Sequence, residues 1–362
     1  MKILLVINSL NGGGAEKIIV EFTRRLSRIK DIEVKFLVLS SKRAVYLNAL
    51  VDADIEVMFL GKNEYNPWLI VKMIPIISQF DIVHVHLFPA QYFVGLASFL
   101  SRHRKKPALI FTEHSSHNKR LGKPCLRWLE KWIYFRYGSV IAVSQSVKNK
   151  VCSWINHRNI VKIPNGIPID SISVAPIYSK VELAAQFGIP EGAKLMLMAA
   201  RFEFPKRQDL LVQVLGLLPG NYHLLLAGSG TNESHVNAVA LRNGVAERVR
   251  FLGFRDDIYS LMKSVDINVL WSDYEGMSGV VLEAMMAGKP YLGSDVEGIN
   301  DIIPASDFLF DSLADLAAKV RILCENQAEA ANCVEIGRRY AADYHLDIMV
   351  KRHVELYKSH IN

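Results

Sequence analysis

Two glutamates eight positions apart are the first residues whose spacing points to a binding site. Residues 275–283 read EGMSGVVLE, with Glu275 before a run of small residues and Glu283 inside an apolar run. Because burial of a carboxylate without a partner is costly, Glu283 needs a partner close by. Carboxylates at these positions can accept hydrogen bonds from sugar hydroxyls. The alternative for Glu283 is a salt bridge with a local Lys or Arg.

The residues around the two glutamates predict a strand, a loop and a helix. The apolar run DINVLW is a buried strand, and Ser278 is the expected N-cap of a helix that ends near Gly288, with Pro290 beyond it. Backbone N–H groups of residues 276–279 would then point into a cleft at the carboxyl end of the strand.

Two cations follow another apolar run, in the stretch AARFEFPKRQD. Arg201 and Lys206 would lie just after a buried strand, where two positive side chains suit a diphosphate. The alternative is that Lys206 and its neighbour Arg207 form a solvated pair on the surface.

A glycine-rich stretch, NGGGAEK, follows the first apolar run and opens a predicted helix. Glycines allow close approach of the backbone, and a helix N-terminus favours an anion, so Gly13 and Gly14 are expected to bind one. The alternative is a tight turn only. A dinucleotide fingerprint starting at Gly12 would need glycine where Lys17 stands, and the next strand lacks an acidic end, so an NAD dehydrogenase is disfavoured.

The elements that position these stretches alternate between apolar runs and amphipathic segments. This alternation predicts an α/β fold in which two doubly wound parallel sheets face each other, with a cleft lined by loops at the carboxyl ends of the strands. The stretch VKIPNGIP interrupts the pattern, so we place a first domain at 1–170 and a second at 171–341. We expect residues to about 190 to be a linker.

Composition and length exclude several classes of protein. The chain has 362 residues, half of them apolar and 22% charged, which suits two globular domains. It lacks an apolar stretch of 18 residues, and its N-terminus is expected to form a strand instead of a signal peptide. The four cysteines form no C-x-x-C pair, which favours a reducing cytoplasm.

The charge is divided unevenly along the chain. Residues 1–170 carry 25 Lys and Arg against 12 Asp and Glu, a charge of +13, and the remainder carries −6. A basic first half points to an anionic partner: nucleic acid, an anionic membrane surface or an acidic acceptor. The alternative is a solvated basic surface without a partner. No RNA-binding motif is present, so a nucleic-acid-binding protein is the less favoured hypothesis.

Taken together, these motifs resemble those of retaining glycosyltransferases of family 4. EGMSGVVLE matches the E-x7-E signature of that family, and the resemblance extends over most of the chain through GGGAE, FTEH, IPNGI, R-x4-K at Arg201 and Lys206, AGSG and FLGF. The resemblance implies the GT-B fold of two facing Rossmann-like domains. It also implies a final helix, at about 342–362, that packs back on the first domain.

The resemblance assigns roles on the donor side. Glu283 would bind the ribose hydroxyls of a nucleotide sugar, and Glu275 would contact the donor sugar near the reacting carbon. Arg201 and Lys206 would hold the diphosphate. The remaining expected donor contacts are the backbone amides of Gly276, Met277, Ser278 and Gly279, the base-framing residues Phe254 and Arg255, and Gly13 and Gly14. Many members of the family have Pro or Asn where this chain has Ser278 and Gly279, and that difference could alter the choice of donor.

On the other side of the reaction, His114 resembles the histidine that the family places close to the sugar. Glu113, His86, Lys119 and Arg120 are expected on the acceptor side. Glu113 could instead reach its own loop, and a structural role is the alternative for His86, as for His84.

The implied reaction is transfer of a hexose or N-acetylhexosamine, with retention, to a hydroxyl of a lipid-linked or polysaccharide acceptor. A UDP-sugar is favoured as the donor and GDP-mannose is possible. The cations replace a metal, so no cofactor is expected, and Asp52-Ala-Asp54 is interpreted as a turn. Basic stretches at 101–106 and 119–137 favour peripheral contact with the cytoplasmic face of the inner membrane, in lipopolysaccharide, capsule or oligosaccharide synthesis. A sugar-nucleotide epimerase of the same fold is the alternative enzyme.

Overall fold

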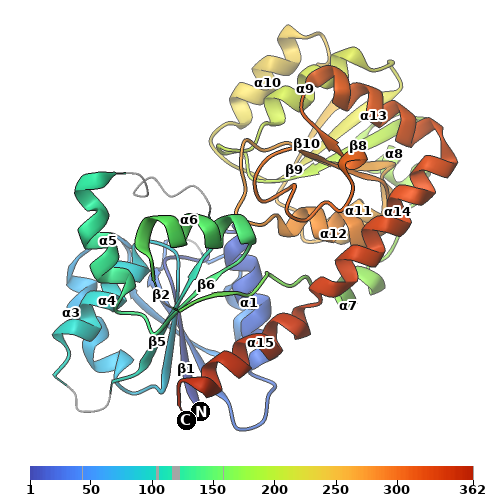
Figure 1. Ribbon diagram of the computed structural model, residues 1–362. Helices are drawn as coiled ribbons and strands as arrows, with labels where there is room; N and C mark the ends of the chain where they lie inside the picture. The colour runs from blue at the N-terminus through green and yellow to red at the C-terminus, as the bar shows by residue number, and fades with distance from the viewer. Residues whose placement is uncertain (43, 103–105, 116–122, 158, 362) are drawn as a thin grey trace. The chain divides into compact units, whose positions relative to one another are not determined.

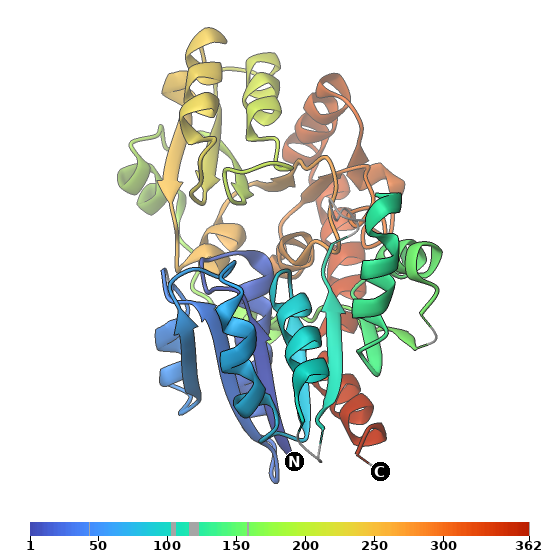
Figure 2. The same ribbon diagram turned by 90° about the vertical axis from the view of Figure 1, so that its left-hand side faces the viewer.

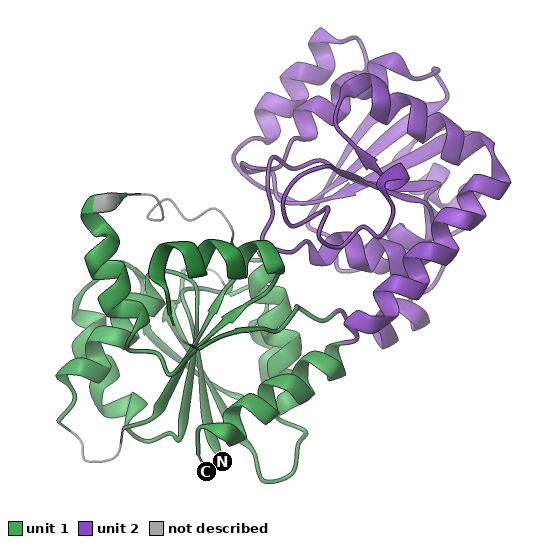
Figure 3. Cartoon of the chain, viewed as in Figure 1, with its two compact units in different colours: residues 1–166, 346–362 green, residues 167–345 purple. Residues whose placement is uncertain are grey.

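The computed structural model divides the chain into two compact units. It describes residues 1–362 except 43, 103–105, 116–122, 158 and 362 (Figure 1). Unit 1 comprises residues 1–166 and 346–362, and unit 2 comprises residues 167–345 (Figure 3). The first division lies four residues before the boundary expected from the sequence, and the C-terminal segment rejoins unit 1 four residues later than expected.

Unit 1 is built on a seven-stranded parallel sheet with the order β3-β2-β1-β4-β5-β6-β7. The central strands are continuous apolar runs, such as KILLVI in β1, because helices cover both faces of a parallel sheet. The strands are β1 (Lys2–Ile7), β2 (Glu33–Ser40), β3 (Glu56–Gly61), β4 (Ile82–His86), β5 (Ala108–Glu113), β6 (Ser139–Ala142) and β7 (Ile160–Lys162).

The helices of unit 1 cover both faces of this sheet. In Figures 1 and 2, α3 and α4 lie on one face and α1 and α15 on the other. The apolar side of α15, with Leu346, Val350 and Tyr357, joins the same core as Phe22 of α1. The helices are α1 (Gly14–Leu26), α2 (Leu47–Val51), α3 (Trp68–Ile77, which contains Pro75), α4 (Ala90–Leu100), η1 (Pro124–Leu126), α5 (Arg127–Tyr134), α6 (Gln145–Ile155) and α15 (Leu346–Ser359).

Unit 2 repeats the architecture with a six-stranded parallel sheet, in the order β10-β9-β8-β11-β12-β13. Its strands are β8 (Lys194–Ala199), β9 (Tyr222–Ala227), β10 (Val249–Gly253), β11 (Ile267–Leu270), β12 (Tyr291–Ser294) and β13 (Leu309–Phe310). The predicted class, two doubly wound Rossmann-like parallel-sheet domains, is therefore confirmed.

The helices of unit 2 include two where the sequence analysis placed a linker. That expectation is wrong, because α7 (Ile169–Val174) and α8 (Lys180–Phe187) occupy this stretch, and Ser179 and Glu182 form a capping box at the start of α8. The other helices are α9 (Gln208–Leu217), α10 (Glu233–Arg242), η2 (Ala246–Arg248), α11 (Ile258–Ser264), α12 (Gly279–Ala287), η3 (Ser306–Phe308), α13 (Leu313–Glu325), α14 (Gln327–Ala341) and η4 (Ala342–Tyr344).

In both sheets the strand order reverses next to a central strand, at β1 and β4 in unit 1 and at β8 and β11 in unit 2. Doubly wound sheets bind ligands outside the carboxyl ends of the strands at such a point. Among the candidate residues, Gly13 and Gly14 follow β1, Arg201 and Lys206 follow β8, and Glu275 follows β11. By contrast, Asp52 and Asp54 lie in a turn after α2, with φ of 56° at Asp54, as the sequence predicted.

Candidate active site

The loop that carries Glu275 is anchored between the ends of two neighbouring strands. The Ser294 hydroxyl at the end of β12 donates to the Ser272 carbonyl at 2.8 Å and accepts from the Ser272 amide at 3.0 Å. The Glu275 amide donates to the Glu297 carbonyl at 3.0 Å. These bonds fix the loop after β11 against the loop after β12, so the position of Glu275 is set by backbone hydrogen bonds.

A glycine is required where the two loops meet. Gly298 has φ of +80°, and a Cβ at this position would overlap the carbonyl of Glu275. The Gly298 carbonyl accepts the Ser278 amide at 3.2 Å. Of the amides at Gly276, Met277, Ser278 and Gly279, that of Ser278 therefore has a partner in the loop after β12.

Ser278 occupies the N-cap position of α12, as predicted, but without the expected cap hydrogen bond. Its hydroxyl is buried and has no hydrogen-bond partner within the described residues. Gly279 is the first residue of α12, where amides lack intrahelical partners. The donors at the N-terminus of α12 are therefore backbone N–H groups of its first turn, which no side-chain cap occupies.

Lys206 and Glu275 form an ion pair at the centre of this region. The side chains are 19% and 15% exposed, and they come from loops that follow β8 and β11. A bridge between Lys206 and Ser272 and a bond from the Asp273 amide to the Pro205 carbonyl, at 3.0 Å, hold the loops together. Burial and the charge of Arg201 lower the pKa of Lys206 to about 7, so its ammonium depends on an anion beside it.

The other cations in this stretch separate into two groups. The Arg201 side chain is 52% exposed and lies 3.3 Å from Glu203. Arg207 instead pairs with Asp209 at 3.0 Å and with Asp273 at 3.2 Å, whereas Lys206 is directed to Glu275. The alternative of a solvated Lys206–Arg207 pair is therefore wrong.

The AGSG stretch positions the loop of Arg201 by close backbone approach. A Cβ at Gly228 would overlap the Ala200 carbonyl, and one at Gly230 would overlap the Phe202 carbonyl. The Phe202 amide donates to the Ser229 carbonyl at 3.0 Å. Glycines after β9 thus allow the loop after β8 to lie directly against them.

Glu283 in α12 is 7% exposed and has a partner that the sequence analysis did not name. The hydroxyl of Tyr259, in α11, donates to Glu283 Oε1 at 3.0 Å. This bond orients the carboxylate without neutralising it. The periodicity of the sequence places Tyr259 on a helix, but nothing in the sequence shows that its hydroxyl meets Glu283.

The two residues expected to frame a base differ in their surroundings. Phe254, after β10, is 48% exposed. Arg255 donates twice to Asp257, at 2.8 and 2.7 Å, and its guanidinium lies 5.7 Å from the ring centre of Phe187. This hydrogen-bonded pair lowers the pKa of Asp257. Arg255 therefore has a structural role of its own, whereas the ring of Phe254 is accessible.

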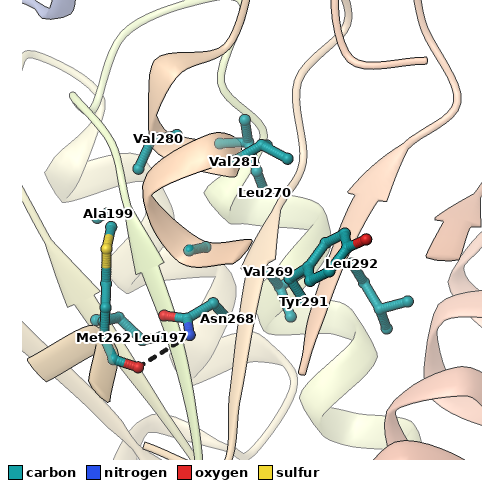
Figure 4. Close-up of a pocket in the computed structure, with 11 residues that line it drawn as sticks. Leu197, Ala199, Met262, Asn268, Val269, Leu270, Val280, Val281, Tyr291 and Leu292 are labelled. Carbon is teal, nitrogen blue, oxygen red and sulfur yellow. Dashed lines mark hydrogen bonds between the residues drawn. The ribbon is translucent and has the colours of Figure 1, made fainter. Parts of the chain in front are cut away.

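A cavity beneath α12 is too small to be the binding site. It is lined by residues of β8, α11, β11, α12 and β12, and Asn268 donates from its floor to the Met262 carbonyl at 3.1 Å (Figure 4). Its volume of about 10 Å³ is close to that of one water-sized probe. This cavity therefore has no room for a nucleotide or a sugar.

In unit 1, His114 follows β5 and contacts His86 at the end of β4. His86 Nδ1 lies 3.1 Å from His114 Nε2, and the ring centres are 5.3 Å apart. Burial lowers the pKa of His114 to about 4 and that of His86 well below its ordinary value, so both rings are neutral at pH 7. His84 is fully buried between Tyr357, at 2.6 Å, and Thr112, at 2.7 Å, which is the structural alternative considered for it.

The structure describes some of the residues expected on the acceptor side and not others. Glu113 accepts from the Tyr134 hydroxyl at 2.6 Å and more weakly from the Ser115 amide at 3.4 Å, so its carboxylate does reach its own loop. Lys119 and Arg120 lie outside the described residues.

The glycine loop of unit 1 carries a carboxylate of the chain itself. Gly13 is the N-cap of α1, and a Cβ there would overlap the buried carboxylate of Glu16. Gly12 has φ of +94°, which favours glycine, whereas a Cβ at Gly14 would meet nothing within 4 Å. An anion at Gly13 would lie close to Glu16, which makes the predicted anion site less favourable there than at Gly14.

The described residues hold neither a metal-binding cluster nor a helix that could span a membrane. They contain no group of three or more His, Cys, Asp or Glu side chains that is arranged to hold a metal ion. In the same part of the chain, no helix has both the length and the apolar character that crossing a bilayer requires.

Comparison with known proteins agrees with the geometry. Residues 12–171 match the family described as Glycosyltransferase Family 4, and residues 179–340 match Glycosyl transferases group 1. A phosphatidyl-myo-inositol mannosyltransferase of Mycobacterium leprae is 30% identical over 287 residues, which cover 73% of this chain and 70% of that protein. An uncharacterized glycosyltransferase of Methanocaldococcus jannaschii is 29% identical over 240 residues, 63% of this chain and 60% of the relative's length.

Among solved structures, the Anabaena protein HepE in complex with UDP-glucose superimposes with a TM-score of 0.87. The two chains are 21% identical, and the superposition covers 99% of this chain and 100% of the other. At this identity the likeness shows a shared fold.

Proposed function

The chain belongs to glycosyltransferase family 4, and on that premise we propose that it transfers a hexose or N-acetylhexosamine from a UDP-sugar to a hydroxyl, with retention of configuration. The observation that carries the proposal is the buried Lys206–Glu275 pair beside Arg201, with Glu283 on the following helix. A diphosphate needs cations, and a sugar and a ribose need hydrogen-bond acceptors. Both kinds of group follow neighbouring strand ends of unit 2.

The proposed chemistry uses Lys206 and Arg201 to stabilise the leaving group. The bond between the anomeric carbon and the β-phosphate oxygen breaks, and the two cations offset the charge that develops on the departing diphosphate. The acceptor oxygen attacks the same face of an oxocarbenium-like sugar, and its proton passes to the departing phosphate. The diphosphate joins Glu275 as a counterion of Lys206 and further stabilises the ammonium that burial disfavours. We propose that no resident metal is needed for this step.

Glu283 is proposed to bind the ribose through the oxygen atoms that Tyr259 orients. The test is a calorimetric titration of UDP, 2′-deoxy-UDP and 3′-deoxy-UDP into the wild type and Glu283→Gln. Removing the ribose hydroxyl that donates a hydrogen bond to Glu283 should weaken binding to the wild type by about tenfold or more, because the acceptor is charged. The variant should discriminate less between UDP and that deoxy analogue, because the amide oxygen of Gln still accepts a hydrogen bond but carries no charge.

The matched control is Glu329→Gln, the same substitution at an exposed position of α14. It should leave all three affinities unchanged. If Glu283→Gln lowers the affinities for UDP and both deoxy analogues by the same factor, Glu283 does not bind the ribose hydroxyls and that assignment is wrong.

Two relatives bear on the donor and acceptor. HepE was solved with UDP-glucose, which supports a uridine donor, and the mycobacterial relative is named as a mannosyltransferase, which keeps GDP-mannose as the second candidate. Its name also gives a lipid, phosphatidyl-myo-inositol, as the acceptor. We therefore propose a lipid-linked acceptor in surface-glycan synthesis, with the protein at the cytoplasmic face of the inner membrane.

Unit 1 presents a mixed aromatic and basic surface that suits contact with such a membrane. Trp128 in α5 is 71% exposed, and Phe99, Leu100 and Phe135 are also exposed. Lys131 lies on the same helix, whereas Ile133 and Tyr134 are buried, so only part of α5 packs inward. Of the aromatic residues of α5, Tyr134 is thus buried in unit 1, whereas Trp128 is open to solvent.

Sedimentation with vesicles tests the membrane proposal. The protein should sediment with phosphatidylglycerol vesicles in low salt and remain in the supernatant with phosphatidylcholine vesicles. The double variant Trp128→Ala/Lys131→Glu should reduce binding severalfold without changing UDP affinity. Equal binding to both vesicle types, or unchanged binding of the variant, would contradict this surface as the contact.

A further inference from the structure

Four imidazoles form a continuous array through unit 1 that the proposed reaction does not explain. His353 of α15 lies 5.5 Å from His84, His84 lies 4.1 Å from His86, and His86 lies 5.3 Å from His114, measured between ring centres. His84, His86 and His353 are buried, and only His114 is partly exposed. The array therefore leads from the C-terminal helix to the histidine that follows β5.

Both rings at the α15 end of the array, His353 and His84, are hydrogen-bonded. His353 Nδ1 lies 2.8 Å from the Met349 carbonyl, so it must carry the proton and donate it. His84 has a hydroxyl at each nitrogen, Tyr357 at Nδ1 and Thr112 at Nε2, and each hydroxyl can donate or accept. A neutral His84 is thus satisfied in either tautomer, and its ring is fixed at both ends.

His86 is different, because only one of its nitrogens has a partner. Nδ1 contacts His114 Nε2 at 3.1 Å, whereas Nε2 is buried and has no hydrogen-bond partner among the described residues. Two neutral arrangements are possible. If His114 donated from Nε2, the proton of His86 would lie on its own Nε2 as a buried, unpaired N–H. If His86 donates from Nδ1, only a lone pair of Nε2 is left without a partner.

The second arrangement is favoured, since buried N–H groups without an acceptor are rarer than under-satisfied acceptors. We propose that His86 is a positioning residue: it donates its Nδ1–H to His114 Nε2 and so fixes His114 as the tautomer that carries its proton on Nδ1. The ring of His86 is confined by close packing against His84, whose ring centre is 4.1 Å away and which Tyr357 of α15 and Thr112 of β5 hold in place.

This assignment gives His114 a defined chemical role that rests on the proposed function. With Nε2 occupied by His86, the group that His114 offers to a ligand is Nδ1–H, a neutral hydrogen-bond donor. A donor of this kind suits a hydroxyl oxygen of the transferred sugar. A nitrogen that already carries the proton cannot act as a base, so proton abstraction from the acceptor is not the task of His114 Nδ1.

The first test measures the tautomer directly and does not depend on activity. Long-range ¹H–¹⁵N correlation spectra of the full chain with ¹⁵N-labelled histidine, at pH 7, identify which nitrogen of each ring is protonated. The His114 signals are assigned by their loss in His114→Gln. The proposal requires Nδ1 protonated and Nε2 bare in the wild type. An Nε2-protonated His114, or an imidazolium, would overturn it.

The second test uses a pair of matched variants at position 86. His86→Asn retains an N–H donor near the position of Nδ1, whereas His86→Phe retains the ring and removes the donor. His114 should keep the Nδ1–H tautomer in His86→Asn and become a mixture of tautomers in His86→Phe. An unchanged His114 spectrum in His86→Phe would refute a positioning role for His86.

Kinetics with a UDP-sugar extend the comparison to function. In His86→Phe, kcat should fall by roughly tenfold or more and recover partly in His86→Asn, while KM for the donor changes little, because a misplaced group costs the chemical step more than binding. Equal losses in both variants would contradict the proposal. Absence of nucleotide binding to the wild type would refute the glycosyltransferase function, yet leave the tautomer result standing.

Discussion

Lowering the pH from 7 to 5 should destabilise unit 1 strongly because of its buried histidines. The pKa values of His114 and His353 are lowered to about 4, mainly by burial, and those of His84 and His86 are lowered well below the ordinary value for the same reason. In the unfolded chain each imidazole titrates near 6.5. Between pH 6.5 and 4 the unfolded state therefore binds more protons than the folded state.

The sign and size of the effect follow from that difference. Stability is fully present above the unfolded pKa and is lost as the pH falls through the window toward the folded pKa. For a group with values of about 6.5 unfolded and about 4 folded, the loss from pH 7 to pH 5 is about 2 kcal/mol. His114 and His353 together give about 4 kcal/mol, and His84 and His86 add in the same direction. This is a large part of the roughly 5–15 kcal/mol that stabilises a typical domain.

Tryptophan fluorescence during urea unfolding measures this change. Four of the five tryptophans, Trp68, Trp128, Trp132 and Trp154, are in unit 1, so the signal is dominated by that unit. His353→Phe should remove about 2 kcal/mol of the difference between pH 7 and pH 5. His235→Phe, at an exposed position of α10, is the matched control. If the two variants change the pH difference equally, or the wild type shows none, the reasoning is wrong.

Three further predictions concern unit 2. Lys206→Met should lower kcat/KM about a hundredfold by removing a cation from the leaving group, measured as UDP release with saturating acceptor; an unchanged value would exclude Lys206 from the reaction. Gly298→Ala should lower the free energy of unfolding by about 1–3 kcal/mol, since φ of +80° and overlap with Glu275 both oppose a Cβ. Urea unfolding followed by circular dichroism measures this change, and an unchanged midpoint would contradict the prediction. Tyr259→Phe should weaken UDP binding severalfold while Tyr274→Phe does not, because the Tyr259 hydroxyl donates to Glu283; calorimetry giving equal affinities for the two variants would refute that role.

The architecture was predictable because the buried strands are recognisable in the sequence. Runs such as KILLVI and YHLLLA are continuous apolar segments, and buried parallel strands are the elements that need them. The error at residues 171–190 has a local cause. Two prolines in VKIPNGIP indicate an interruption, but the S-x-x-E pattern of Ser179 and Glu182 is that of a capping box and indicates a helix start.

The site was predictable in its residue types and less so in its contacts. The distance from Lys206 to Glu275 along the chain is 69 residues, and only the strand order brings them together. The same holds for Tyr357, which lies 273 residues from His84 and reaches it through α15. Periodicity places such residues on a helix or strand, but side-chain partners depend on tertiary packing. The pairing of Arg255 with Asp257, two residues away, was the contact that the sequence could have indicated.

The most direct test of the glycosyltransferase assignment is nucleotide binding to the wild type and Glu283→Ala. UDP, GDP, CDP and ADP are each titrated by calorimetry, with thermal unfolding recorded in parallel, since a ligand that binds the folded state raises its stability by mass action. The account predicts binding of UDP in preference to the other three, with the affinity reduced at least about tenfold in Glu283→Ala. A wild-type protein that unfolds cooperatively and binds none of the four nucleotides would contradict the proposed function.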